Sequence, residues 1–225
     1  MASAKFLLIC SLMAIVLREI HGHGMMLDPV SRSSAWREGF DVPPNHNDNQ
    51  LFCGGLKAQY EENGGKCGLC GDNYALPRPR PNENGGTYGT GVIVKNQGQT
   101  MHVNVSLSMN HLGTFSFAVC PLEHQKDLES EECFDMHPVK LSDGSSELKV
   151  LDKQLRFDVV VRLPEDVTCE HCVFRWTYHG GNKAGTCKDG STAMGCGPQV
   201  TFRNCADWRT LSRAIVRKIA RHGVE

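Results

Sequence analysis

The cysteines constrain the fold of this chain more than any other feature. The sequence has 11 of them, and Cys10 alone lies before residue 53. The other ten form an even set, namely Cys53, Cys67, Cys70, Cys120, Cys133, Cys169, Cys172, Cys187, Cys196 and Cys205. In a secreted chain such a set is typical of a disulfide framework, in which each bridge contributes about 2–4 kcal/mol. The pairing stays open, because ten thiols can pair in on the order of a thousand ways.

The N-terminal segment predicts secretion. Lys5 is followed by an apolar run from Phe6 to Leu17, which has the length of a signal peptide and is too short to span a membrane. Gly22 is a small residue suited to the position before a cleavage site, so residues 1–22 are expected to be removed and His23 to become the N-terminus. The sequon at Asn104 predicts glycosylation, which fits the same extracellular compartment.

Apolar residues recur with period two in five short segments, which predicts a mainly-β chain. The predicted strands cover residues 101–108, 115–119, 155–161, 173–178 and 199–202. Short strands separated by turn residues favour an antiparallel β-sandwich. Residues 37–90 are instead rich in Gly, Pro and Asn and predict long loops, which Cys53, Cys67 and Cys70 could strap to the sandwich.

Charge is distributed unevenly although the net charge is only −1. Basic side chains gather in residues 208–225, which leaves the preceding body mildly acidic and argues against nucleic-acid binding. Trp208, Leu211, Ile215 and Ile219 stand at helical spacing. The tail is therefore predicted to be a basic amphipathic segment, either binding a membrane surface or anionic partner or packing as a terminal helix on the sandwich.

A mature N-terminal histidine is a metal chelator. The reference pKa of an α-amine is about 7.7–8.0, so a metal can displace its proton near neutral pH. The amine and Nδ1 of His23 would then close a chelate ring, and Gly24 would let the chain turn beneath the metal. A second imidazole would complete a planar set of three nitrogens, which suits copper.

The sequence alone leaves the second imidazole open. The candidates are His46, His102, His111, His124, His137, His171, His179 and His222. His111 is favoured because it lies in a predicted loop between two predicted strands, where ligands collect at the end of a sandwich. The alternative is that it is an ordinary surface histidine.

Several blocks of sequence, in order, resemble the animal (insect-type) lytic polysaccharide monooxygenases of auxiliary-activity family fifteen. The N-terminal blocks are HGMMLDP at residues 23–29 and SRSSAWR at 31–37. The middle blocks are NQLFCGG at 49–55, CGLCGD at 67–72 and NHLG at 110–113. The last blocks are CGPQ at 196–199 and TFRNCAD at 201–207. Together they span nearly the whole chain expected after cleavage.

The resemblance implies a fold and a metal site. The fold would be an immunoglobulin-like (fibronectin-III-like) antiparallel sandwich over residues 23–207, and the cofactor one copper ion. The ligands would be His23, through its amine and Nδ1, and His111. Phe202 would occupy the protein-side axial position, where the family often has tyrosine; phenylalanine would leave that position apolar.

Two positions depart from the family pattern. Met109 stands where a small residue is usual, and its thioether could narrow the open coordination position or approach Cu(I). Val200 stands where Glu or Gln is common, so a polar group that would steer oxygen or peroxide is missing. Gln199 is expected to face the other way. Both changes bear on activity and leave the copper ligands intact.

The resemblance also implies a reaction. The substrate would be a crystalline polysaccharide, with chitin first and cellulose second, cleaved by oxidation at C1. An external electron donor and either hydrogen peroxide or dioxygen would be required, and the enzyme would act as a secreted monomer. Trp36, Tyr60 and Tyr88 are candidates for stacking on sugar rings, and the sequence does not choose among them.

Other function classes are weighed against this one. The pairs Cys67/Cys70 and Cys169/Cys172 could build a zinc ribbon, but they are far apart in the chain. A thioredoxin-like site would lack its βαβ setting, and His171 is expected to be solvated. Because Met109 and Val200 depart from the family pattern, a non-catalytic module that binds copper or chitin remains an alternative. A structural cuticle protein would need low-complexity repeats, which are missing.

Overall fold

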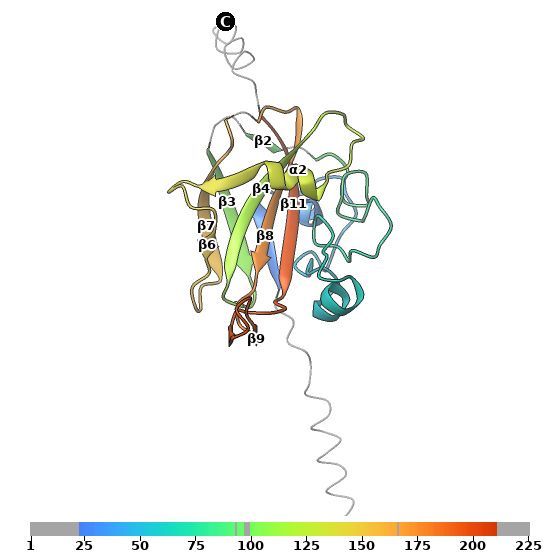
Figure 1. The fold of residues 1–225 in the computed structure, drawn as a ribbon. Helices are drawn as coiled ribbons and strands as arrows, with labels where there is room; N and C mark the ends of the chain where they lie inside the picture. The colour runs from blue at the N-terminus through green and yellow to red at the C-terminus, as the bar shows by residue number, and fades with distance from the viewer. Residues whose placement is uncertain (1–22, 93, 97–99, 166, 211–225) are drawn as a thin grey trace, which may run out of the picture.

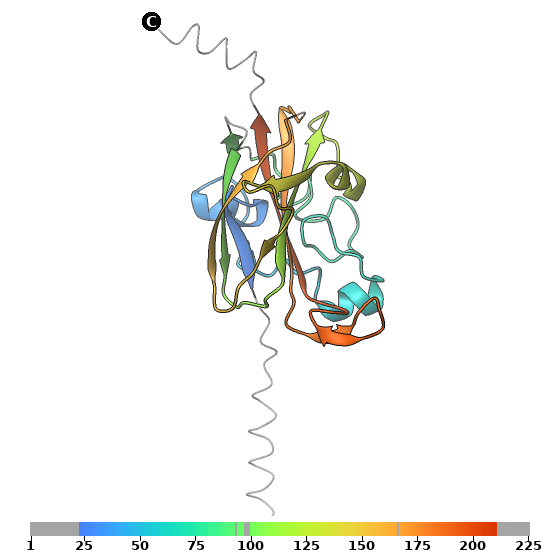
Figure 2. The same cartoon turned by 60° about the vertical axis from the view of Figure 1, so that its left-hand side comes forward.

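The computed structural model describes residues 23–92, 94–96, 100–165 and 167–210. The predicted signal peptide and residues 211–225 of the predicted tail lie outside the described residues. The described chain forms a β-sandwich that is flanked by short helices and loops (Figures 1 and 2). The prediction of a mainly-β antiparallel sandwich with long loops strapped by disulfides is confirmed.

The strands pair in the spatial order β1-β3-β7-β5-β4-β8-β11-β2, with β6 paired to β4. Because β5 pairs with both β7 and β4, it joins the two layers at one edge. Neighbouring strands are antiparallel, except that β11 pairs with β2 in parallel. Their bounds are β1 Gly24–Asp28, β2 Val94–Asn96, β3 Thr100–Leu107, β4 Thr114–Leu122, β5 Pro138–Leu141, β6 Leu148–Lys149, β7 Arg156–Arg162, β8 His171–His179 and β11 Thr201–Thr210.

The predicted alternation along β3 is observed. Val103, Val105 and Leu107 are buried, while His102 is exposed. Asn104 faces outward from the same strand, where its amide donates a hydrogen bond to Asp158 (2.5 Å). These apolar side chains meet Phe115 and Trp176 from the other layer in one hydrophobic core.

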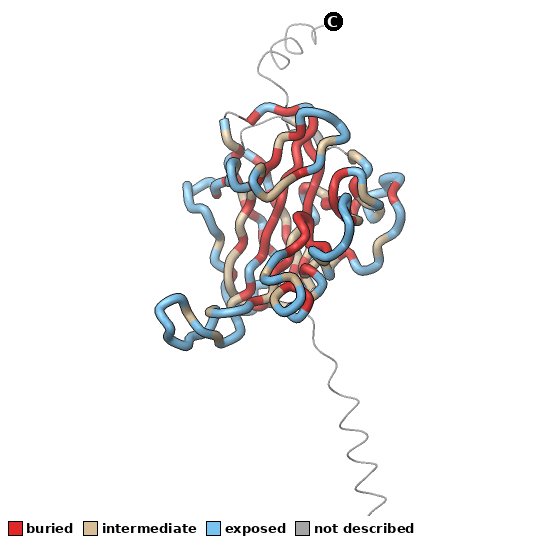
Figure 3. Tube along the Cα trace, turned by 45° about the vertical axis from the view of Figure 1, so that its right-hand side comes forward, coloured by how far each residue is buried: buried red, intermediate tan, exposed pale blue. Residues whose placement is uncertain are grey.

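The central strand β8 is buried on both faces, from His171 to Tyr178, as the tube in Figure 3 shows through the middle of the molecule. Its inner face carries Phe174, Trp176 and Tyr178, as predicted. Its outer face is covered by the helix α2 (Glu131–Met136) and by the loops between residues 63 and 90. The guanidinium of Arg175 on this outer face lies 4.0 Å from the ring centre of Phe134 of α2.

Disulfides strap the loops as predicted. Cys53 pairs with Cys67, and Cys70 pairs with Cys205 on β11, which fastens the 63–90 loops to the sandwich. The other pairs are Cys120–Cys133, Cys169–Cys172 and Cys187–Cys196. Two short helices lie in or beside the loop region, η1 (Arg32–Glu38) and η2 (Lys57–Glu62). Cys187–Cys196 closes a hairpin of β9 (Ala184–Thr186) and β10 (Thr192–Met194).

The last strand differs from the sequence prediction at both ends. It was predicted over residues 199–202, but β11 begins at Thr201 and continues to Thr210. Trp208 was assigned to a helical face of the tail, and its side chain is instead buried in the core. The helical prediction for Trp208 was wrong because Trp208 belongs to a strand. It stands an even number of residues from Phe202 and Ala206, so all three side chains point into the core. None of the helices in the described residues has the length and apolarity needed to cross a bilayer.

Candidate metal centre

His23 lies at one end of the sandwich, directly before β1. Its carbonyl oxygen accepts hydrogen bonds from the backbone N–H of Ser108 (2.8 Å) and from the Ser108 hydroxyl (3.2 Å). Gly24 was expected to form a turn, but it lies in β1. Glycine is needed here for close packing instead, because a Cβ on Gly24 would stand 2.7 Å from Cδ2 of Leu107. His23 is therefore fixed next to the end of β3.

His111 lies in the loop that connects β3 to β4, at the same end. Asn110 braces this loop by donating to the carbonyl oxygens of Leu151 (2.8 Å) and Gln154 (2.7 Å). Gly113 has φ of +84°, and a Cβ there would stand 1.9 Å from the carbonyl oxygen of His179. The loop conformation thus requires glycine at this position.

The His111 imidazole is 9% exposed and has one unsatisfied nitrogen. Nδ1 lies 2.9 Å from the amide nitrogen of Asn182. Nε2 is buried and has no hydrogen-bond partner among the described residues. Burial lowers the pKa of His111, and the charges of Lys183 and His23 lower it further, whereas the hydrogen bond between the ring and Asn182 raises it. The lowered pKa favours the neutral ring, and a buried Nε2 without a partner among the described residues fits a metal ligand.

Phe202 and Val200 border the same histidine. The ring of Phe202 is 1% exposed, and its centre lies 6.2 Å from that of His111. The Val200 side chain approaches from the neighbouring segment, where a Cβ on Gly180 would meet both Val200 Cγ1 (2.9 Å) and His111 Cβ (3.3 Å). The surroundings of His111 on this side are therefore apolar.

Most of the other candidate histidines lie elsewhere. His171 was expected to be solvated, but it is buried, and its Nε2 lies 2.7 Å from Oδ1 of Asp207. The expectation failed because Asp207, on the adjacent strand β11, stands 36 residues further along the chain. His46 packs on Trp36, and Nδ1 of His137 lies 2.8 Å from the Cys133 carbonyl oxygen. His222 lies outside the described residues.

Asp207 belongs to a buried ionic network at the opposite end of β11. Arg32 donates two hydrogen bonds to its carboxylate (2.8 and 2.6 Å) and one to Glu129 (2.6 Å). Glu129 also accepts from the backbone N–H of Asn84. This network, which the sequence did not indicate, holds η1 and the 63–90 loops against the sandwich.

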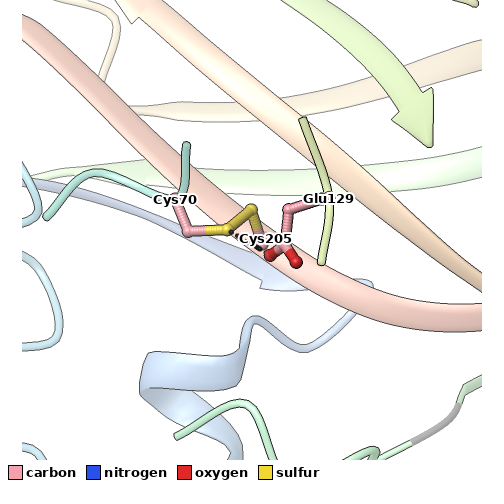
Figure 4. Close-up of side chains that lie close together, drawn as sticks. All are labelled: Cys70, Glu129 and Cys205. Atoms are coloured by element: carbon pink, nitrogen blue, oxygen red, sulfur yellow. Dashed lines mark hydrogen bonds between the residues drawn. A yellow bond between two sulfur atoms is a disulfide. The ribbon is translucent and has the colours of Figure 1, made fainter. Parts of the chain in front are cut away.

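The ten cysteines of the described residues offer no alternative metal site. Donor atoms of Cys70, Glu129 and Cys205 lie within 4.8 Å of one another. Figure 4 shows, however, that the two sulfurs are joined as a disulfide beside the carboxylate. Cys67 and the Cys169/Cys172 pair are also bridged, so the zinc-ribbon alternative is wrong.

Two of the three aromatic candidates for sugar stacking make contacts within the protein, and the third lies away from His23. Tyr60 on η2 donates its hydroxyl to the carbonyl oxygen of Gln199 (3.0 Å). Trp36 is contacted by His46 and lies 4.5 Å below the guanidinium of Arg37. Tyr88 follows the loop of residues 80–84, which is bonded to Arg32 and Glu129. Tyr88 therefore belongs to the end of the molecule away from His23.

Comparison with known families identifies the family to which the chain belongs. A family model described as "Lytic polysaccharide mono-oxygenase, cellulose-degrading" matches residues 23–208. The chain belongs to the lytic polysaccharide monooxygenases. A search of curated protein sequences gave no significant match.

A solved structure narrows the assignment within the monooxygenases. It is the lytic polysaccharide monooxygenase AA15 from Thermobia domestica in the Cu(I) state, with 45% sequence identity and a TM-score of 0.81. The match covers 84% of this chain and 98% of that one. This protein is therefore a copper-dependent monooxygenase of the insect type, auxiliary-activity family fifteen, with one copper ion as its cofactor. Membership favours the enzyme over the non-catalytic module, which the departures at Met109 and Val200 had kept open.

Proposed function

We propose that this monooxygenase is secreted, holds its copper ion between His23 and His111, and oxidises crystalline chitin at C1, with cellulose as a second substrate. The observation that carries the proposal is that Nε2 of His111 is buried and has no hydrogen-bond partner among the described residues. Ser108, three residues before His111, donates a hydrogen bond to the backbone of His23. Removal of residues 1–22 would free the α-amine of His23 as the third nitrogen.

The proposed ligands are what the chain itself contributes to the chemistry. Burial keeps His111 neutral, so that it offers a lone pair without first releasing a proton. Phe202 carries no oxygen, so it leaves its side of the site apolar. When bound, copper supplies the redox chemistry, using an electron donor and dioxygen or hydrogen peroxide to oxidise the sugar. One oxygen atom of hydrogen peroxide, or of dioxygen supplied with two electrons and two protons, would become a hydroxyl group at C1, and the other oxygen would leave as water. The hydroxylated carbon would then expel the neighbouring sugar as an alcohol, which breaks the chain and leaves a lactone that water opens to an aldonic acid.

The loops around the site form the proposed substrate-facing surface. The 150–155 loop is tied to the His111 loop by Asn110, by Val150 N–H to the Gly113 carbonyl oxygen, and by Leu107 N–H to the Leu155 carbonyl oxygen. Figure 1 shows the β6–β7 connection reaching the same end of the sandwich as the start of β1. Leu151 and Leu155 are 59% and 43% exposed on this loop. They would meet the apolar faces of sugar rings, a role for which the three aromatic candidates are less suited.

The substrate order rests on two kinds of support. Resemblance to the insect-type enzymes favours chitin. The description of the matching family names cellulose. Five disulfides fit an oxidising extracellular compartment and support secretion.

The test begins with secreted protein whose N-terminus is sequenced. Copper titration should show one tight site when the chain starts at His23, and a weaker one when an extra residue precedes His23, because the amine is then displaced. His111→Ala should abolish the tight site, whereas His102→Ala, on an exposed position of β3, should leave it intact. Tight binding in the His111→Ala variant would refute the ligand assignment.

Turnover is then measured on crystalline chitin and cellulose with a reductant and hydrogen peroxide. Soluble oligosaccharides ending in aldonic acids are expected from chitin, with fewer from cellulose. Copper binding without products from either polymer would support the non-catalytic module, and products oxidised at another carbon would refute the assignment to C1.

A further inference from the structure

One short segment at the end of β8 holds His111 at three points. The backbone N–H of His111 donates to the hydroxyl of Tyr178 (2.7 Å), and its carbonyl oxygen accepts from the N–H of Gly181 (2.7 Å). The third point is the ring, where Nδ1 lies 2.9 Å from the Asn182 amide. The backbone of His111 is fixed by the first two contacts, so the third determines how the imidazole presents its nitrogens.

Asn182 is itself held in place. On one side, the backbone N–H of its neighbour Gly181 donates a hydrogen bond to the carbonyl oxygen of His111. On the other side the side chain of Gln199 accepts from the N–H of Lys183 (3.1 Å) and donates to its carbonyl oxygen (2.9 Å). Gln199 also donates to the carbonyl oxygen of Cys196 (2.7 Å), at the base of the β9–β10 hairpin. The amide of Asn182 therefore reaches His111 from a backbone that is fixed on both sides.

The chemistry of a neutral imidazole connects the two ring nitrogens. One nitrogen carries a proton and the other a lone pair, so a partner at Nδ1 decides which form Nε2 takes. If Nε2 carried the proton, it would be a buried donor without an acceptor among the described residues, which is unfavourable. If Nδ1 carries the proton, it needs an acceptor, and Nε2 keeps its lone pair for a metal.

We infer that Asn182 is a positioning residue of the copper centre, whose amide oxygen accepts a hydrogen bond from Nδ1–H of His111 and so directs the Nε2 lone pair at the metal. The amide nitrogen faces Nδ1 in this structure, and a half-turn of the amide group brings the oxygen to the same place. The inference rests on the proposed function, because it takes His111 as a ligand.

The inference specifies the size of the effect. Removal of the hydrogen-bond partner of a metal-ligating histidine typically costs 10–100-fold in affinity. Asn182 is exposed, so water competes for the same hydrogen bond. A loss of about tenfold, at the lower end of that range, is therefore expected.

The test measures copper affinity by competition titration, together with the electron paramagnetic resonance spectrum of the Cu(II) protein. Asn182→Leu and Asn182→Ala remove the acceptor and should each weaken binding about tenfold and alter the spectrum. Asn182→Asp keeps an acceptor and loses the donor, so it should bind copper at least as tightly as the wild type. Thermal unfolding of the metal-free proteins verifies that each variant is folded.

A charge control completes the design, because Asp also adds a negative charge near the metal. The double variant Asn182→Leu/Lys183→Met changes the net charge of the segment by the same amount without supplying an acceptor. Recovery of wild-type affinity in this double variant would refute the inference, as would wild-type affinity and spectrum in Asn182→Leu or weak binding in Asn182→Asp. A wild-type protein that binds no copper would instead refute the proposed function.

Discussion

The ring of Phe202 lies nearly parallel to the ring of His111, at an interplanar angle of 16° and a centre-to-centre distance of 6.2 Å. Two more aromatic rings pack around Phe202: the ring centre of Tyr178 lies 5.7 Å from that of Phe202, and the ring centre of Phe52 lies 5.9 Å from it. Phe202 thus separates the proposed metal ligand from the hydrophobic core. A polar atom on this ring would have few partners.

Phe202→Tyr tests that separation. The added hydroxyl enters a site that is 1% exposed, so the metal-free variant should lose about 1–3 kcal/mol of unfolding free energy. Copper should recover part of this loss if the new oxygen approaches it, and the Cu(II) spectrum should change. Chemical unfolding with and without copper measures both effects. Equal destabilisation in the two states would argue that residue 202 does not face the metal.

Gly113→Ala tests the conformation of the His111 loop. The new Cβ would stand 1.9 Å from a backbone oxygen, so the loop must move and copper affinity should fall sharply. The matched control is Gly144→Ala, since Gly144 has a similar φ of +88° but open space around its Cα. The control should cost only about 1–2 kcal/mol and leave copper binding unchanged. Similar losses of copper binding in both variants would refute the role assigned to the loop.

Asp207→Asn tests the ionic network at the other end of β11. Burial alone would raise the pKa of Asp207, but Arg32 and His171 lower it below its ordinary value. A lowered folded-state pKa stabilises the fold above the unfolded value of about 3.9, and that stability is lost as the pH falls through the folded-state pKa. The wild type should therefore lose stability in acid below about pH 4.

In the Asp207→Asn variant this part of the acid dependence should disappear. At neutral pH the variant should be less stable by about 3–5 kcal/mol, because Arg32 keeps a buried charge with one carboxylate fewer. Unfolding curves from pH 2 to 7, with the disulfides intact, measure both. Asp41→Asn, at an exposed position, serves as the control and should behave as the wild type.

The exposed leucines of the 150–155 loop provide a test of the substrate-facing surface. Replacing Leu151 and Leu155 with serine should weaken binding to crystalline chitin by about threefold to tenfold, because apolar area is lost from the contact. Met136→Ser is the control, since Met136 is 69% exposed on α2, away from the His111 loop. Pull-down isotherms with metal-free protein separate this effect from copper binding. Equal binding by wild type and double variant would exclude the loop from the surface.

The sequence predicted the strands that are buried on one face, because alternation records a single buried side. It understated β8, whose outer face is covered by α2 and the 63–90 loops, so that Val173, Arg175 and Thr177 are buried as well. The network of Arg32 with Asp207 and Glu129 joins residues 175 and 97 positions apart, and no local pattern signals such contacts.

The proposed ligands could be predicted from the sequence, whereas the residue that positions one of them could not. An N-terminal histidine after a signal peptide is a recognisable chelator, and resemblance then selected His111 from the other histidines. Asn182 was missed because its contact with His111 exists only once β8 and the β3–β4 loop come together.

The strand that carries Phe202 begins at the metal end of the sandwich and ends at Thr210, at the opposite end (Figure 1). Thr210 therefore lies at the end of the sandwich away from the proposed copper ligands. An affinity tag, a surface anchor or an extra carbohydrate-binding domain can be attached beyond that end, which leaves the proposed copper site accessible. With His23 as the proposed N-terminus and copper ligand, the same addition there would occupy its α-amine, so immobilised or fused forms should be built from the C-terminus.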